Sequence, residues 1–281
     1  MGPRFETVSF LSDYGLVDEF AGVVKAVILA IAPGTTVVDV THQVPAHDVR
    51  AGGLTLARSI QYLLPGVVVA VVDPGVGSAR RAVAVEVGTD TGGNGDGDSI
   101  GTSVLVGPDN GLLAPAAAIA GGARRAVSLT NTDFHLDAPG QTFAGRDIFG
   151  PVAAHLCRGV DLAELGEEVD PLSLIPGIIP LSRLEDDRVE AEVLWVDRFG
   201  NVQLNVDPAE IAAMGDRVVL GHADTSRTVV RVGSYSDLGP GQIGLVVDSY
   251  GLLAVALNRR SAADELHLGP GDGVSLALAS E

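Results

Sequence analysis

The sequence predicts an N-terminal doubly wound α/β sandwich domain followed by a C-terminal antiparallel β-barrel-like domain. Up to about residue 165, apolar strand patterns alternate with helix patterns, which is the rhythm of βαβ units. From Val189 onward, short strand patterns follow one another with Gly and Asp at the turns. Residues 171–188 are rich in Pro and apolar residues without clear periodicity. We therefore expect domains at residues 1–170 and 189–281, joined by a connector at residues 171–188.

The strands of the first domain are predicted from short apolar or β-branched runs. The run at residues 67–72 is uninterrupted, which is typical of a buried parallel strand. One helix is expected to be capped by Asp18 and to end near Ile31, and another to begin at Asp48 and end near Leu64. The other expected elements are strands at residues 8–11, 36–40, 81–87 and 104–106 and a helix at residues 148–156.

A stretch rich in Gly and Asp at residues 88–101 interrupts this pattern. It resembles a calcium loop in composition, but the EF-hand spacing and its closing Glu are absent. We interpret it as a flexible hairpin insertion.

The second domain is expected to be a small antiparallel β domain, because its apolar runs are short and separated by turn residues. The predicted strands are residues 190–196, 202–206, 217–220, 228–232, 243–247, 252–257 and 274–277.

Composition limits the possible partners and the compartment. No apolar run approaches the roughly 20 residues of a membrane span, so no membrane partner is expected. The net charge of −18 repels phosphate backbones and disfavours a nucleic-acid partner. A single cysteine, Cys157, excludes an internal disulfide and fits a reducing compartment. We therefore predict a cytoplasmic protein.

Most familiar catalytic signatures are missing. The histidines show no zinc-site spacing and no phosphate-binding P-loop is present, so we expect no metal and no other cofactor. The notable feature is a set of acids at the carboxyl ends of apolar strands, where ligands bind in open α/β sheets. These acids are Asp13, Asp39, Asp73 and Asp197. For Asp39, helix capping or turn formation is the favoured interpretation.

Asp73 is harder to explain as a simple turn residue. It leaves a buried strand at a Pro-Gly turn, and Arg80 follows after a turn long enough to fold back and pair with it. Two interpretations stay open at this point: the pair orients a polar ligand, or it is a structural ion pair.

Several motifs together resemble one known family. They stand at residues 10–18 (FLSDYGLVD), 45–49 (PAHDV), 72–80 (VDPGVGSAR), 107–111 (GPDNG), 141–147 (QTFAGRD), 197–201 (DRFGN) and 248–251 (DSYG). In this order, along nearly the whole chain, they resemble the hydroxide adenosyltransferases that act on S-adenosyl-L-methionine (SAM). These are adenosine-forming SAM hydrolases, related to the fluorinase and the chlorinase.

The resemblance implies a function and an assembly. SAM would be hydrolysed at the ribose 5′ carbon to adenosine and L-methionine, in a homotrimer whose sites lie between subunits. Asp13 would bind both ribose hydroxyls, because a carboxylate accepts two charge-assisted hydrogen bonds. The other implied substrate contacts are Phe143 at the ribose, Asp197 at the methionine ammonium, Ser249 at its carboxylate, and Asn201 at the adenine edge beside Phe199, Tyr250 and Arg259.

The resemblance also gives Asp73 and Arg80 a role. They match members of an Asp-Arg-His trio that holds the attacking water. The halogenating relatives carry an uncharged residue at the position of Asp73. A carboxylate close to a halide adds repulsion, so a halide-using adenosyltransferase is a less favoured alternative.

One position departs from the family motif, because Ala144 stands where the trio has its histidine. Three interpretations remain open. The histidine could have been removed by engineering. A natural variant could rely on Asp73 and Arg80, helped by His47, which sits where the fluorinase has a pocket aromatic residue. The chain could also bind SAM or adenosine without cleaving it.

Overall fold

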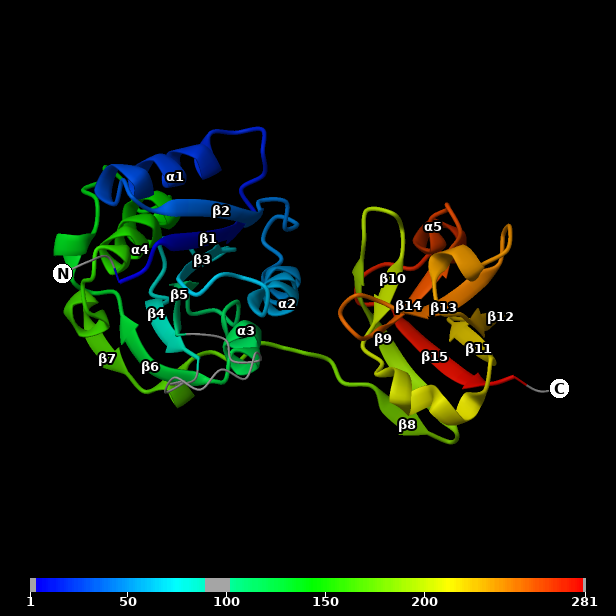
Figure 1. The fold of residues 1–281 in the computed structure, drawn as a ribbon. Helices are drawn as coiled ribbons and strands as arrows, with labels where there is room; N and C mark the ends of the chain where they lie inside the picture. Colours follow the sequence, from blue (N-terminus) through cyan, green and yellow to red (C-terminus); the bar gives the residue numbers. More distant parts are fainter. Residues whose placement is uncertain (1–3, 89–101, 280–281) are drawn as a thin grey trace. The chain divides into compact units, whose positions relative to one another are not determined.

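The computed structural model describes residues 4–88 and 102–279, and the chain forms two compact units, Met1–Ile178 and Ile179–Glu281 (Figure 1). The division lies inside the predicted connector, where a strand that we did not expect, β8 (Arg183–Glu185), is formed. The hairpin predicted at residues 88–101 falls almost entirely outside the described residues. In the part of the chain that is described, no helix has the length and apolar character needed to cross a membrane.

The first unit is built on a mixed sheet in the order β2-β1-β3-β5-β4-β6-β7. The strands β2, β1, β3 and β5 run parallel, whereas β4, β6 and β7 add antiparallel strands at one side. Their bounds are β1 Thr7–Ser12, β2 Thr36–Thr41, β3 Val67–Val71, β4 Ala82–Val87, β5 Ser103–Pro108, β6 Ala123–Ser128 and β7 Glu167–Val169. The parallel half of the sheet positions the candidate site, because β1 and β3 end next to each other.

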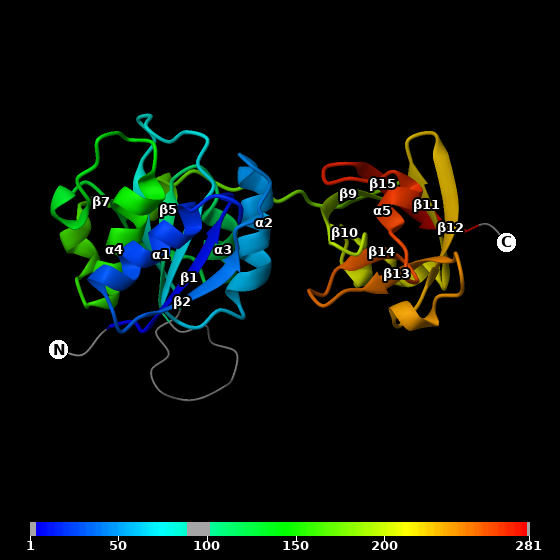
Figure 2. The ribbon, with the colours of Figure 1, turned by 90° about the horizontal axis from the view of Figure 1, so that it is seen from above.

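Helices cover both faces of this sheet, which confirms the predicted doubly wound sandwich (Figure 2). Along β1, Phe10 packs into the core under α1 and α4, and Leu11 packs into the opposite core under α2 and α3. The alternation follows from the two-residue period of a strand. The helices are α1 Phe20–Ile31, α2 Val49–Ile60, α3 Ala114–Ile119 and α4 Gly150–Cys157, with 3-10 turns η1 Thr132–Phe134, η3 Leu162–Leu165 and η4 Pro171–Ser173.

The predicted helix ends hold only in part. Asp48 caps α2 as expected, because its carboxylate accepts the backbone N–H of Ala51 at 2.8 Å. The predicted Asp18 cap is wrong: α1 has Glu19 at its N-cap position without a side-chain bond, so Asp18 lies one residue too early. The helix expected at residues 148–156 is preceded by a π-helix, η2 (Gly145–Phe149), before α4 begins.

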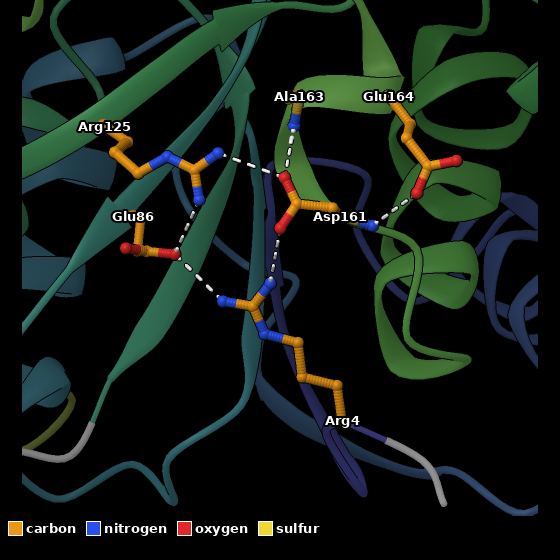
Figure 3. Close-up of polar contacts among 6 residues, drawn as sticks. All are labelled: Arg4, Glu86, Arg125, Asp161, Ala163 and Glu164. Carbon is orange, nitrogen blue, oxygen red and sulfur yellow. Dashed lines mark hydrogen bonds and ion pairs between the residues drawn. The ribbon is translucent and has the colours of Figure 1, made fainter. Parts of the chain in front are cut away.

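A polar cluster anchors the N-terminal segment to this unit (Figure 3). Glu86 on β4, with a side chain 10% exposed, accepts a hydrogen bond from Arg4 at 2.9 Å and lies 3.8 Å from Arg125 on β6. Arg125 also pairs with Asp161 at 3.1 Å, and the Asp161 carboxylate caps η3 through the N–H of Ala163. The cluster thus joins segments that are far apart in the sequence.

The second unit is a closed β-barrel, which confirms the predicted C-terminal fold. Its strands follow the order β10-β14-β13-β12-β11-β15-β9, and β10 pairs with both β14 and β9, so the ring closes. The expectation of a wholly antiparallel domain needs one correction, because β12 and β13 are parallel. The elements are β9 Arg188–Val196, β10 Val202–Leu204, β11 Arg217–His222, β12 Thr225–Arg231, β13 Ile243–Val247, β14 Leu253–Leu257, β15 Gly273–Leu278, α5 Ala262–Leu266, η5 Pro208–Met214 and η6 Tyr235–Asp237.

Candidate active site

Asp13 and Asp73 follow two neighbouring strands at the carboxyl edge of the first unit's sheet. Ser12 of β1 is in register with Val71 of β3, and the backbone N–H of Asp13 donates to the Val71 carbonyl at 3.3 Å. Ligands of open α/β sheets bind at this edge. The structure therefore brings these carboxylates to one side of the sheet, as the sequence predicts.

The Asp13 carboxylate is fixed by the turn before α2. Its Oδ2 accepts the backbone N–H of His47 at 2.9 Å, and His47 adopts a left-handed backbone conformation with φ 68°. The His47 side chain is exposed. The turn thus orients Asp13 through main-chain atoms, whereas the imidazole is left at the surface.

A hydrogen-bonded chain supports the turn that carries Asp13. His42 is 3% exposed. Its Nδ1 atom lies 2.8 Å from Ser12 Oγ, and its Nε2 atom lies 3.0 Å from Asp39 Oδ1. Asp39 also accepts from Lys25 at 2.9 Å. Burial works against the charged Asp39 carboxylate, but the hydrogen bonds from Lys25 and His42 hold the pKa of Asp39 below its ordinary value. Asp39 is therefore neither a helix cap nor a turn residue, and that expectation is wrong.

Asp73 and Arg80 form the pair that the spacing predicts. Arg80 Nε donates to Asp73 Oδ1 at 2.7 Å, and a second guanidinium nitrogen donates to Oδ2. The Asp73 side chain is 5% exposed and the Arg80 side chain is 14% exposed. The guanidinium also lies over the Phe149 ring, 5.5 Å from its centroid. Such a two-point pair fixes the orientation of the carboxylate as well as its position.

The segment that leads to Phe143 and Ala144 passes close to the turn between Asp73 and Arg80. A Cβ atom at Gly77, in the turn between Asp73 and Arg80, would come within 3.2 Å of the Gln141 carbonyl. Ala144 is 7% exposed and directly precedes the π-helix. Helices of this kind occur often at functional sites.

Phe143 belongs to an aromatic group at the edge of a cleft. Its ring lies 5.6 Å from that of Tyr14 and 5.2 Å from that of Phe20, and the Arg146 guanidinium lies 5.1 Å from its centroid. A cleft of about 640 Å³ is lined by these side chains together with Glu19, Val23, Pro139, Gly140 and Thr142. Sequence reasoning missed Tyr14, although it lies next to Asp13.

In the second unit, Asp197 organises the turn between β9 and β10. Its Oδ1 accepts the backbone N–H groups of Phe199 and Asn201, both at 2.8 Å, and its Oδ2 accepts from Asn201 Nδ2 at 2.7 Å. The carboxylate thus holds the Asn201 amide in place, and the remaining N–H and the carbonyl of that amide can face a ligand.

A second cleft, of about 450 Å³, lies beside this turn. Phe199, Asn201 and Arg259 line it, as does Tyr235, which sequence reasoning missed. Burial, followed by the charges of Asp197 and Asp248, raises the pKa of Tyr235, so its hydroxyl keeps its proton.

Ser249 and Tyr250 lie on a separate turn. Asp248 Oδ1 accepts the N–H of Tyr250 at 2.8 Å, and the Tyr250 ring packs edge-on against Trp195 at 6.4 Å. Neither Ser249 nor Tyr250 lines the cleft around Asn201. Of the residues predicted in this unit, the structure therefore brings only Phe199, Asn201 and Arg259 together around the cleft, with Asp197 beside them.

Within residues 4–88 and 102–279, no group of three or more His, Cys, Asp or Glu side chains is arranged to hold a metal ion.

Comparison with known proteins agrees with the resemblance seen in the sequence. The chain matches the SAM hydroxide adenosyltransferase N-terminal domain over residues 8–166 and the C-terminal domain over residues 191–275. It is 46% identical over 265 residues to a Salinispora tropica protein named (R)-S-adenosyl-L-methionine hydrolase, covering 94% of this chain and 95% of that one. A Thermus thermophilus protein of the same name is 40% identical over 277 residues, covering 96% and 98%.

More distant relatives and a solved structure extend this comparison. A fluorinase of an Actinoplanes species is 26% identical over 297 residues, covering 97% of each chain. A crystal structure of an uncharacterized conserved protein from Thermotoga maritima matches with a TM-score of 0.85 and 31% identity, covering 96% of this chain and 99% of that one.

Proposed function

Because the chain belongs to the SAM hydroxide adenosyltransferase family, we propose that it hydrolyses SAM to adenosine and L-methionine. The observation that carries this proposal is the hydrogen-bonded Asp73–Arg80 pair at the sheet edge that also carries Asp13, in a chain similar along its length to named SAM hydrolases. The pair offers a fixed carboxylate at the edge of the sheet where a ligand would bind.

In the proposed reaction, a water molecule attacks the ribose 5′ carbon. The new C–O bond forms as the C–S bond breaks, and the electron pair of that bond stays on sulfur, which leaves as the neutral thioether of methionine. The sulfonium needs no protonation, so the protein has to position the water and accept its proton. Asp73 accepts that proton and passes it to solvent, and Arg80 fixes the direction of the carboxylate.

Other side chains would hold the substrate. Asp13 would bind the ribose hydroxyls and Phe143 would pack on the ribose, with His47 at the rim. Asp197 would pair with the methionine ammonium, and Ser249 would donate to the methionine carboxylate. Asn201 would read the adenine edge next to Phe199 and Arg259, whereas Tyr250 would approach the base from its separate turn. The cleft beside Asn201 supports the adenine assignment, because it has an apolar wall and an oriented amide.

The assembly is also a proposal. We expect a homotrimer in the cytoplasm, in which each site combines residues of the first unit of one subunit with residues of the second unit of another. Each unit carries an open cleft next to predicted site residues, with Phe143 in the wall of the first and Asn201 in the wall of the second, which supports a site completed by association. A halide-using reaction is disfavoured, because Asp73 would repel the anion.

One experiment tests the reaction directly. The protein is incubated with SAM in water enriched in oxygen-18, and the products are separated by chromatography and weighed by mass spectrometry. We expect adenosine that carries the heavy oxygen at its 5′ hydroxyl, and unlabelled methionine. SAM that is bound but not cleaved would instead support the alternative of a binding protein, and an Asp73→Asn variant provides the low-activity control.

A further inference from the structure

The hydroxyl of Tyr14 lies against the main chain of the segment that carries Ala144. A Cβ atom added to Gly145 would lie 2.2 Å from Tyr14 Oη, so glycine is required beside this hydroxyl. The backbone of Gly145 thus approaches the phenolic oxygen closely, and this contact works to lower the pKa of Tyr14. The phenolic O–H can donate a hydrogen bond to a further partner.

The same hydroxyl lies in the field of the charged groups at the sheet edge. Burial, followed by the charges of Asp13 and then Asp73, raises the pKa of Tyr14, and Arg80 opposes this rise. The phenol therefore keeps its proton at neutral pH and acts as a hydrogen-bond donor. Arg80 itself packs on Phe149, the last residue of the π-helix that begins at Gly145, so the pair and the hydroxyl adjoin the same segment.

The Tyr14 ring is held in place by other aromatic rings. Its centroid lies 6.3 Å from that of Phe10, 5.9 Å from that of Phe20 and 5.6 Å from that of Phe143. A hydroxyl on a ring packed in this way is oriented before a ligand arrives, so little entropy is lost when it forms a hydrogen bond. Ala144, the neighbour of Gly145, has no hydrogen-bonding side-chain group.

We propose that the Tyr14 hydroxyl is a further catalytic group, which donates a hydrogen bond to the attacking water. This inference rests on the proposed hydrolysis. The water would give one hydrogen bond to Asp73 and accept one from Tyr14, so its second lone pair is left to attack the 5′ carbon. Tyr14 forms no covalent bond and loses no proton, since the proton released by the water leaves through Asp73.

The test is the Tyr14→Phe variant, which removes the hydroxyl and keeps the ring. We expect kcat for adenosine release to fall roughly tenfold to a hundredfold, while the Kd for adenosine, measured by calorimetry, stays unchanged. Tyr62→Phe, on a tyrosine that is 67% exposed at the end of α2, is the matched control and should leave kcat unchanged.

A second variant covers the case in which Tyr14→Phe folds poorly. In Gly145→Ala, the added methyl group must displace the hydroxyl, so kcat should fall although the tyrosine is retained. If the wild-type protein releases adenosine and both variants match its kcat, this inference is overturned and the proposed hydrolysis stands. If the wild-type protein releases none, the hydrolysis and this inference fall together.

Discussion

Arg80 and Asp73 are joined by a two-point hydrogen-bonded pair at the carboxyl end of β3, with Nε 2.7 Å from Oδ1. Placing both charges out of water costs about as much free energy as their attraction returns, so stability alone does not explain the pair. Its specific effect is to fix a carboxylate in one orientation beside Asp13. That arrangement suits a group that must hold a water molecule in line with a reacting carbon.

The first prediction concerns this carboxylate. Asp73→Asn keeps the size of the side chain but cannot take up a proton from water, so we expect kcat to fall by about 10²–10⁴-fold. Adenosine release measures the rate, and calorimetry with adenosine checks that binding survives. Arg80→Lys keeps the charge but loses the two-point geometry, and an intermediate loss is expected. Wild-type turnover by Asp73→Asn would remove Asp73 from the mechanism.

The second prediction concerns halides. The Asp73 carboxylate repels an anion, and most of its side chain is shielded from water, so chloride added with SAM should not yield 5′-chloro-5′-deoxyadenosine. Chromatography against the authentic compound measures the product. Formation of this product at a rate comparable with that of adenosine would contradict the assignment of Asp73 as the group that faces water.

The third prediction tests whether sites are shared between subunits. Asp73→Asn in the first unit and Asp197→Asn in the second should each be nearly inactive alone. When the variants are co-expressed, about a third of the sites in each mixed trimer should be restored, because one site of the three draws an intact half from each variant. Activity is measured on oligomers that carry the affinity tags of both variants. Mixed oligomers no more active than the parents would place each site within a single chain.

The fourth prediction concerns the cluster around Asp161 (Figure 3). The backbone N–H of Ala163 and the hydrogen bond from Arg125 lower the pKa of Asp161 below its ordinary value of 3.8. A depressed folded-state pKa adds stability above the unfolded pKa, and this stability is lost as the pH falls through the folded value. Asp161→Asn keeps a helix-capping group but loses the charge. Its free energy of unfolding, from urea titrations between pH 3 and 7, should therefore fall less steeply below about pH 4 than that of the wild type.

Apolar runs were the most reliable guide to the fold. The strand predicted at residues 67–72 matches β3 within one residue, because a run of valines is both a strong strand former and a core-facing surface. In contrast, α3 and β6 were missed. Helix α3 has only six residues, and β6 contains Arg124 and Arg125, whose charge hides the strand pattern. Burial of Glu86 on the neighbouring strand, paired with Arg125, explains why a charged strand is tolerated there.

Within the site, the sequence predicted contacts between residues that are close together along the chain. Arg80 could be paired with Asp73 because the intervening turn is long enough to fold back, and Asp48 could be recognised as a cap from the helix that follows it. Tyr14 could not be recognised, because its role depends on Gly145, which is distant in sequence and approaches only in the folded chain. The same holds for Tyr235, which reaches the cleft at Asn201 from another part of the barrel.

The last prediction concerns Ala144. This residue is 7% exposed and packs in the core under α1 and α4, so a larger side chain here must displace its neighbours. A histidine at this position supplies an imidazole that can hydrogen-bond the attacking water. In Ala144→His we expect kcat to rise at least about tenfold, because general-base assistance typically supplies ~10²–10⁴-fold, with little change in the Kd for adenosine. Ala144→Leu adds similar bulk without a hydrogen-bonding group, so it should not raise kcat. Both variants should lose some stability in thermal unfolding because of overpacking.

A rise in kcat for both variants would point to bulk as the cause. If Ala144→His leaves turnover unchanged while Asp73→Asn abolishes it, the water is held without any group at position 144.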